Sequence, residues 1–392
     1  MKTCSQERSC PSIDKIALGA LGCDCIDNKT RNKLERKRIL METVRLGKTN
    51  LMVSQVGLGG IPLTRPTDDE AVRVIRRCLD LGVNFIDTAV GYGDSEARIG
   101  KAIAGRREKV VVATKSPWKS KATALKLLDL SLKRLNTAYI DLWQLHGVNT
   151  PEACEQVLGP GGAMEAAGEA LQAGKIRHIG FSSHNVDVAL TLVTSEQFET
   201  VMVPLNFVSD EATEKLIPAA RKHDVGFLAM KPFAGGRIRD ANLAIKYLLQ
   251  FEGVVPVPGV EKAEEMEEIV GIVNGSWELT PQQRQEMEDI RTRVGTRFCR
   301  QCEYCMPCSE GVQIPALMYL PILWELWPPE WFLSWGYVSD AVNSARNCTK
   351  CGECEEKCPY SLPIRDMIDE NLEFYERVKQ QHQTLSGSPS RQ

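Results

Sequence analysis

The segment VVVATKSPWKSKATALKLLDLSLKRLNTAYIDLWQLH, residues 110–146, contains two short apolar runs with an amphipathic stretch between them. The runs 110–115 and 140–146 are almost continuously apolar, which is typical of strands in a parallel sheet covered on both faces. The stretch 122–135 has its apolar residues at helical spacing. The segment therefore predicts a strand–helix–strand unit.

The same alternation continues on both sides of this unit. Further strand candidates are residues 52–58, 84–87, 176–182, 201–207, 225–231 and 254–259, with amphipathic stretches such as 68–82 and 212–224 between them. Eight such strands in about 225 residues match a closed (β/α)8 barrel. The alternative is an open doubly wound sheet, which usually carries G-x-G-x-x-G after its first strand, and GLGGIP at 57–62 lacks that spacing. We therefore expect an α/β fold, a (β/α)8 TIM barrel.

The composition argues against several classes of protein. The chain has 392 residues and a formal net charge of −3 with both signs spread along it, so we expect no nucleic-acid binding. No apolar run reaches the roughly 20 residues that span a bilayer. Fourteen cysteines would suggest disulfides in a small secreted protein, but the chain is not small and has no clear export signal. We therefore expect a cytoplasmic protein, with a lipid anchor at Cys23 as the less favoured alternative.

Composition also divides the chain into four parts. Residues 1–40 hold a basic run and four unordered cysteines, and we expect them to be a disordered extension. The barrel is expected over 41–295 and ends in a helix at 280–294, opened by Thr280 and Pro281. A mainly helical cysteine domain is expected over 296–372, and the polar tail 373–392 is predicted to be disordered.

Eight cysteines form two ordered runs, CRQCEYCMPC at 299–308 and CTKCGECEEKCP at 348–359. They are Cys299, Cys302, Cys305 and Cys308, then Cys348, Cys351, Cys354 and Cys358. The second run matches the C-x2-C-x2-C-x3-C-P pattern of [4Fe–4S] ligation, whereas the first departs from it, with Pro307 before its last cysteine. Zinc usually prefers separated C-x2-C pairs, often with histidine, and disulfides need an oxidising compartment. The pattern therefore favours iron–sulfur ligation over both alternatives.

Polar residues stand where several predicted strands end: Asp87, Tyr92, Lys115 and His146. In a (β/α)8 barrel catalytic groups lie at the C-terminal ends of strands. A tyrosine hydroxyl has a pKa near 10, and a neighbouring ammonium, held by a carboxylate, is expected to lower it. An imidazole beside them can orient a carbonyl oxygen. Together the four residues predict an apparatus for protonating a carbonyl.

Three segments carry a family resemblance: NFIDTAVGYGDSEARIGKAI at 84–103, VVVATK at 110–115 and YIDLWQLHG at 139–147. They resemble signature segments of the aldo-keto reductase superfamily, and the similarity extends from about Val44 to Val273. The resemblance implies hydride transfer between NAD(H) or NADP(H) and a small carbonyl or alcohol substrate. It also implies a catalytic tetrad of Asp87, Tyr92, Lys115 and His146, with Tyr92 as proton donor.

The same resemblance implies a cofactor site across the barrel mouth. Its expected residues are Gly59, Gly60, Ser182, Ser183, Met202, Met230, Lys231, Pro258 and Gly259. Ser183 stands where the family usually has Asn, Met202 where it has Gln, and Met230 where it has a ring-stacking Tyr. Glutamates at 264, 265, 267 and 268 crowd the helix where a 2′-phosphate would bind, which weighs against NADPH. The alternative is that these glutamates only form a solvated helix face.

The segments CEYCMPCSEGVQIP at 302–315 and CGECEEKCPYSLPI at 351–364 resemble the two-cluster ferredoxin module fused to a group of aldo-keto reductases. In two-cluster ferredoxins the fourth cysteine of a run ligates the other cluster. This resemblance implies that Cys299, Cys302 and Cys305 with Cys358 bind one [4Fe–4S] cluster, and that Cys348, Cys351 and Cys354 with Cys308 bind the other.

Clusters pass single electrons, whereas a nicotinamide gives up two as a hydride. The alternatives are a flavin or another two-electron carrier near the barrel, a separate redox partner such as a ferredoxin, or clusters that only staple the domain. Two rival functions are a nicotinamide sensor without turnover and an electron-transfer subunit. Between the runs, Trp331 and Trp335 are expected on one helix face. With Trp324 and Trp327 they pack the domain or, alternatively, dock a partner.

Overall fold

The computed structural model describes residues 41–117 and 120–386; the predicted extension 1–40 lies outside them. In this part of the chain eight parallel strands form one sheet in chain order. They are β3 (Leu58–Gly59), β4 (Phe85–Asp87), β5 (Val111–Ser116), β6 (Ile140–Leu145), β7 (Ile176–Ser182), β8 (Thr200–Pro204), β9 (Gly226–Met230) and β10 (Val254–Pro256). Gly57 N donates to Pro256 O and Gly59 N to Pro258 O, both at 2.8 Å, so the first strand joins the last. The predicted parallel α/β barrel is confirmed.

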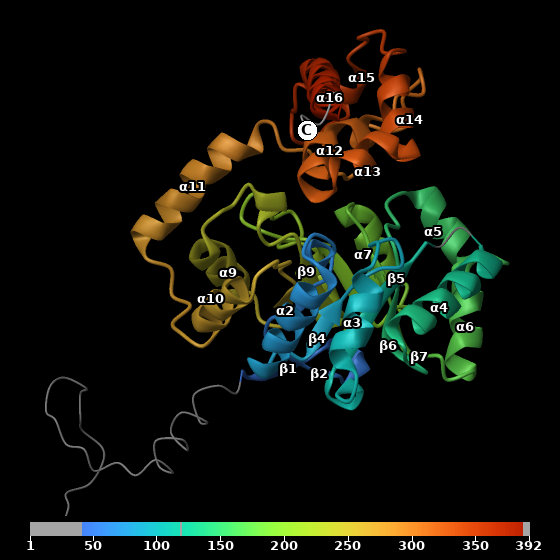
Figure 1. The fold of residues 1–392 in the computed structure, drawn as a ribbon, viewed down its shortest axis with the longest axis vertical. Helices are drawn as coiled ribbons and strands as arrows, with labels where there is room; N and C mark the ends of the chain where they lie inside the picture. Colours follow the sequence, from blue (N-terminus) through green and yellow to red (C-terminus); the bar gives the residue numbers. More distant parts are fainter. Residues whose placement is uncertain (1–40, 118–119, 387–392) are drawn as a thin grey trace, which may run out of the picture. The chain divides into compact units, whose positions relative to one another are not determined.

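Helices follow the strands around the outside of the barrel (Figure 1). They are α2 (Asp68–Asp80), α3 (Ser95–Ile103), α4 (Lys121–Leu135), α5 (Pro151–Leu158), α6 (Ala163–Gln172), α7 (Val186–Thr194), α8 (Leu216–Lys222), α9 (Ala241–Leu249) and α10 (Ala263–Val273). Helix α2 shows why they form: Thr67 and Glu70 make a capping box at its start, and Val74 and Ile75 lie buried on its inner face.

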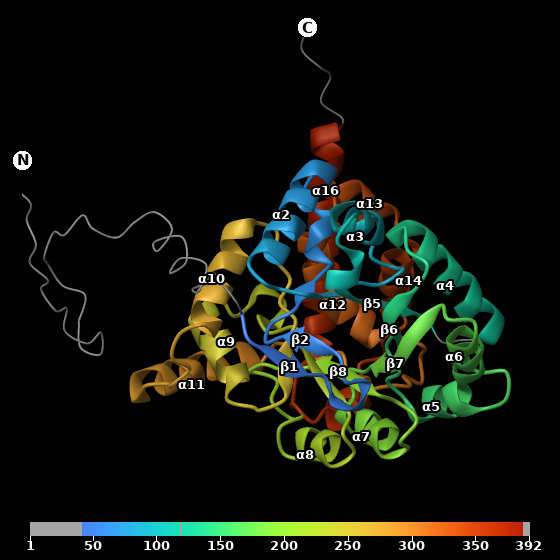
Figure 2. The same ribbon diagram turned by 90° about the horizontal axis from the view of Figure 1, so that it is seen from below.

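A hairpin of β1 (Thr43–Arg45) and β2 (Met52–Ser54) crosses the N-terminal end of the barrel (Figure 2). Its Leu46 and Val53 are buried in one cluster with Phe85 of β4. The predicted first strand, 52–58, is therefore wrong as one element. Ser54 Oγ donates to Val56 O at 2.7 Å, and this bend separates β2 from β3.

The C-terminal part is helical, as predicted. Thr280 and Gln283 form a capping box that opens α11 (Pro281–Gly295), which confirms the predicted helix at 280–294. There follow α12 (Ile314–Leu326), α13 (Pro329–Ser334), α14 (Gly336–Ala345), α15 (Glu353–Glu356) and α16 (Ile364–Ser386). The tail prediction is wrong as far as Ser386, because Tyr375 and Val378 bury an apolar face of α16 against the domain.

Trp327, Trp331 and Trp335 form one aromatic group, but not on one helix, whereas the ring of Trp324 meets Phe332. Helix α13 ends at Ser334, so Trp335 lies outside it, contrary to the prediction that it shares a helix face with Trp331. The rings nevertheless meet: Trp327 stacks on Trp331 at 5.1 Å between centroids, and Trp331 lies 6.1 Å from Trp335.

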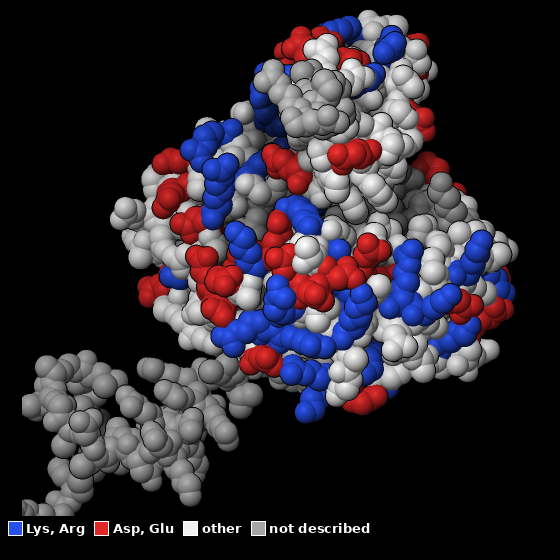
Figure 3. All heavy atoms as spheres, viewed as in Figure 1, with Lys and Arg blue, Asp and Glu red and all other residues white. Residues whose placement is uncertain are grey.

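The surface shows no large region of one charge on the face in Figure 3, where Lys and Arg side chains lie among Asp and Glu. A search of the described residues finds no helix both long and apolar enough to cross a membrane.

Candidate active site and cysteine cavities

Asp87 ends β4 and Lys115 lies in β5, and the two side chains form an ion pair. Lys115 Nζ lies 2.5 Å from Asp87 Oδ2 and donates to Thr88 O at 2.8 Å. Gln144 Nε2 donates to the other carboxylate oxygen at 2.9 Å. Burial raises the pKa of Asp87 and lowers that of Lys115, and the pairing opposes both shifts. Sequence reasoning missed Gln144, whose place in β6 looks like that of any core residue.

Tyr92 and His146 complete the predicted tetrad, which the fold brings together from three strand ends. Their rings meet edge to face with centroids 5.8 Å apart, and Lys115 Nζ lies 5.1 Å from the Tyr92 ring centroid. The expected lowering of the Tyr92 pKa is wrong: burial raises it, and the negative charge of Asp87 raises it further. Tyr92 therefore stays a protonated phenol at neutral pH.

Two histidines lie at the mouth with their charge suppressed. Burial, and then the charge of Lys115, lowers the pKa of His146 to about 3. Burial also lowers the pKa of His184 well below its usual value, assisted by Lys231 and His146. Both rings are therefore neutral at neutral pH. In each ring one nitrogen can donate a hydrogen bond and the other can accept one. His184 was not predicted; it directly follows the serine pair of β7.

The predicted glycines of the cofactor site lie at the seam where the barrel closes. A Cβ on Gly59 would come within 3.2 Å of Gly259 N, and one on Gly60 within 2.7 Å of Ser95 Oγ. A Cβ on Gly259 would lie 2.5 Å from a ring carbon of Pro62. The close approach of β3 and the segment after β10 therefore favours glycine at 59 and 259, whereas Gly60 is packed against Ser95 and the backbone of Asp87. Pro258 lies on the same seam through its bond to Gly59.

The other predicted cofactor residues differ in their hydrogen bonding and in how exposed their side chains are. Ser182 Oγ accepts from Gly147 N at 3.0 Å, and Ser183 Oγ donates to Asn185 O at 3.1 Å. Met202 is only 1% exposed and packs in the barrel interior, so core packing accounts for it. Met230, at the end of β9, is partly exposed.

Acidic residues at the start of α10 are engaged within the protein. Glu265 Oε2 accepts from the backbone N–H groups of Glu261 at 2.7 Å and Lys262 at 3.2 Å. Without Glu265, backbone N–H groups at a helix start can bind a phosphate. Arg65 forms an ion pair with Glu261, and Arg77 pairs with Glu267 at 2.7 Å. A carboxylate of the chain itself thus occupies the helix start.

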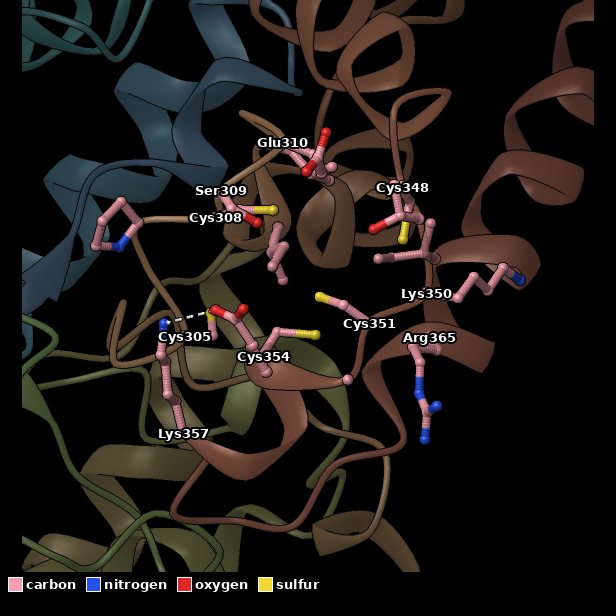
Figure 4. A pocket seen from close by; sticks show the side chains of 17 residues that line it. Cys305, Cys308, Ser309, Glu310, Cys348, Lys350, Cys351, Cys354, Lys357 and Arg365 are labelled. Carbon is pink, nitrogen blue, oxygen red and sulfur yellow. Dashed lines mark hydrogen bonds and ion pairs between the residues drawn. The ribbon is translucent and has the colours of Figure 1, made fainter.

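The eight ordered cysteines line two cavities of the helical domain. The first cavity is lined by Cys299, Cys302, Cys305 and Cys358. The second is lined by Cys305, Cys308, Cys348, Cys351 and Cys354. Figure 4 shows the sulfur atoms of the second cavity facing a common space. In the part of the chain that the structure describes, no three Cys, His, Asp or Glu side chains are placed to hold a single metal ion.

The first cavity adjoins the barrel through three hydrogen bonds. Asn185 Nδ2 donates to Cys302 O at 3.2 Å, and Asn149 Nδ2 donates to Glu303 Oε1 at 2.8 Å. The hydroxyl of Tyr304 donates to the carboxylate of Asp187. Asn149 follows β6, and the other two barrel residues follow β7. The first cysteine run is therefore bound to the C-terminal end of the barrel.

The barrel matches known proteins. The sequence model of the Aldo/keto reductase family matches residues 55–243. Aldo-keto reductase YhdN of Bacillus subtilis is 33% identical over 204 residues, which are 47% of this chain and 60% of that protein. The oxidoreductase YqkF of the same organism is 31% identical over 217 residues, 52% of this chain and 68% of that protein. L-galactose dehydrogenase of Arabidopsis thaliana is 31% identical over 219 residues, with shares of 51% and 68%.

Solved structures agree with this. The holo form of aldo-keto reductase AKR11C1 from Bacillus halodurans is 26% identical, with a TM-score of 0.55, over 64% of this chain and 96% of that chain. An aldo-keto reductase from Klebsiella pneumoniae, solved in complex with NADPH, shares the fold at 23% identity, with a TM-score of 0.55, over 64% of this chain and 95% of its own. The protein described here therefore belongs to the aldo/keto reductase family of NAD(P)-dependent oxidoreductases.

Proposed function

We propose that the barrel reduces a small carbonyl substrate, or oxidises the corresponding alcohol, with Tyr92 as the proton donor. The observation that carries this proposal is the convergence of Tyr92, His146 and the buried Asp87–Lys115 pair at one end of the barrel. When bound, a reduced nicotinamide supplies the hydride for the carbonyl carbon.

The residues around Tyr92 divide the remaining work. The raised pKa keeps the phenol protonated, so it has a proton to give to the carbonyl oxygen as negative charge develops there. Lys115 lies over the Tyr92 ring and stabilises the phenolate left behind, while Asp87 and Gln144 hold the ammonium in place. His146, neutral at physiological pH, donates a hydrogen bond that orients the carbonyl.

For the nicotinamide we propose a site across the barrel mouth, made of Gly59, Gly60, Ser182, Ser183, Met230, Lys231, Pro258 and Gly259. Met230 supports this assignment because its partly exposed thioether can pack against a flat ring. The carboxylate of Glu265 at the start of α10 repels a 2′-phosphate, so we propose that NADH binds at least as well as NADPH.

We propose further that the two cavities hold [4Fe–4S] clusters with crossed ligation, as the cysteine spacing implies. Each cavity is lined by three cysteines of one run and the last cysteine of the other, which is the donor set such clusters take, and Cys305 lines both cavities. Gln301 N donates to Cys299 Sγ at 3.4 Å, a bond that stabilises thiolate character. When bound, each cluster accepts and releases one electron. We favour electron exchange with a partner protein such as a ferredoxin, in the reducing cytoplasm, over a purely structural role.

The test is anaerobic purification of the full chain, with iron, sulfide and flavin assayed and the reduced protein examined by electron paramagnetic resonance. About eight irons per chain support two clusters, and zinc in their place would reject the redox proposal. NAD(P)H oxidation with a panel of small aldehydes and ketones tests the barrel separately. A bound flavin would identify the two-electron carrier between nicotinamide and clusters.

A further inference from the structure

Lys231 directly follows β9 and lies between the barrel mouth and the helical domain. Its Nζ is 5.1 Å from the ring centroid of Tyr319 in α12. Its φ of +56° falls in the left-handed region, which a lysine rarely adopts. The buried Asn206 holds this conformation, because its Nδ2 donates to Lys231 O at 2.9 Å. A conformation that costs free energy and is held by a buried side chain is typical of functional positions.

The charges around Lys231 leave its ammonium uncompensated. Its pKa is lowered to about 8, mainly by burial and in smaller part by the positive charge of Arg237 on the same loop. Among the described residues, Cys299 of the first cavity is the acidic group that opposes this shift, and no carboxylate pairs with Lys231. A partly buried cation beside a second cation is unfavourable unless an anion lies near it.

The cations that line the second cavity differ from Lys231 in this respect. Each is exposed, and each has its own carboxylate: Lys350 pairs with Asp369, Lys357 with Glu353 at 3.4 Å, and Arg365 with Glu355 at 2.7 Å. Figure 4 shows Lys350 and Arg365 directed away from the sulfur atoms. A cation without a carboxylate partner is therefore found near the first cavity and not in the lining of the second.

Helix α12 keeps Lys231 near the first cavity, because Tyr319, whose ring lies under Lys231, directly follows Met318 in the lining of that cavity. A Cβ on Gly235, in the loop of Lys231, would lie 3.5 Å from Ile322 Cδ1, and one on Gly93, beside Tyr92, would lie 3.6 Å from the Trp327 ring. Ile322 is buried in a cluster that also contains Ala234 and Phe298. The position of Lys231 relative to Cys299 is thus determined by packing between the barrel and the helical domain.

We propose that Lys231 is the counter-charge of the [4Fe–4S] cluster in the first cavity, and that it raises the reduction potential of that cluster. This inference rests on the cluster site in the proposed function. A cluster held by four thiolates is an anion, and reduction adds one more negative charge. A nearby cation stabilises the reduced state more than the oxidised one, because the Coulomb energy grows with the charge.

The experiment is an anaerobic redox titration of the full chain, followed by electron paramagnetic resonance, on wild type and three variants. K231M removes the charge at similar length, K231R keeps it, and K350M removes a cation that lines the second cavity but is paired with Asp369. We expect K231M to shift one of the two cluster potentials to a more negative value and to leave the other unchanged. K231R and K350M should both stay close to wild type. K231Q is a second neutral variant in case K231M folds poorly.

Different experimental results would overturn this inference alone or the proposed clusters as well. Unshifted potentials in K231M and K231Q, with iron and sulfide at wild-type levels, would overturn this inference and leave the proposed clusters standing. Unshifted potentials together with weaker NADH binding, measured by fluorescence titration, would also overturn this inference and leave Lys231 with its place in the proposed nicotinamide site alone. Wild-type protein without iron and sulfide would overturn the proposed clusters and this inference together.

Discussion

The Nζ of Lys115 lies 2.5 Å from the Oδ2 of Asp87, and the two residues are 1% and 5% exposed. Neither charge could stay buried alone, because desolvation costs several kcal/mol per ion. As a pair they bring an ammonium to the Tyr92 ring without adding net charge to the barrel. Burial, and then the negative charge of Asp87, raise the pKa of Tyr92 and outweigh the effect of this ammonium.

Replacing Tyr92 by Phe removes the proposed proton donor and keeps the ring. We expect Y92F to lose carbonyl reduction by about 10²–10⁴-fold, the usual contribution of general acid catalysis. NADH binding, measured by fluorescence titration, should stay close to wild type. The matched control is Y139F, which removes a hydroxyl that donates to Glu108 far from the mouth. Near-wild-type turnover by Y92F would reject the mechanism.

Gln144→Leu removes a donor from the buried Asp87 carboxylate. A hydrogen bond to a buried charged group contributes about 1.5–3 kcal/mol, so Q144L should lower the free energy of unfolding by about that amount. It should also lower turnover, because Asp87 then holds Lys115 less firmly. Urea denaturation and steady-state kinetics measure the two effects. Q250L, which changes an exposed glutamine, is the control, and equal effects of both variants would contradict the assigned role.

Glu265→Ala frees the backbone N–H groups of Glu261 and Lys262 and removes a negative charge from the start of α10. We expect wild type to bind NADH at least as well as NADPH, and E265A to gain NADPH affinity relative to NADH. Fluorescence titration with both cofactors measures the ratio. E268A, on the same helix, should leave the ratio nearly unchanged. A wild type that strongly prefers NADPH would show that the 2′-phosphate is bound elsewhere.

The pH dependence of reduction follows from the directions of two pKa shifts. His146, with a pKa of about 3, gains a proton only in strong acid, and Tyr92, with a raised pKa, loses its proton only in strong alkali. At saturating NADH, so that the pKa of about 8 of Lys231 does not limit cofactor binding, kcat for reduction should therefore be flat from about pH 6 to pH 9, since neither Tyr92 nor His146 changes charge there. Samples returned to pH 7.5 after each assay control for inactivation. A bell-shaped profile centred near pH 7 would contradict these assignments.

Crossed ligation predicts which variants share a defect. C358A should damage the same cluster as C299A, and C308A the same cluster as C348A, so each pair should give matching resonance spectra. Iron should fall from about eight to about four per chain in each variant. C154A, a buried cysteine of α5, should keep all its iron. Matching spectra for C308A and C299A would show that each run serves its own cluster.

The amino-acid sequence was enough to predict the barrel fold, the four residues of the tetrad and the two cysteine runs. Patterns within short segments predict these features: apolar runs of strand length, apolar residues at the 3.6-residue period of a helix, and fixed cysteine spacing. The capping residues Thr67 and Thr280 likewise mark where α2 and α11 begin. Such patterns gave a wrong prediction for residues 52–58, where one apolar run forms two strands separated by a bend at Ser54. They also gave a wrong prediction for the polar C-terminal residues of α16, which continue an amphipathic helix.

Which residues from distant segments lie in contact could be seen only in the folded structure. The pairing of Glu265 with the helix start, the bond from Gln144 to Asp87 and the raised pKa of Tyr92 all depend on burial and on contacts across the fold. The same holds for Lys231, which no local pattern places over the ring of Tyr319 in α12. A charge responds to everything within several ångströms of it, and the chain brings those neighbours together only when it packs.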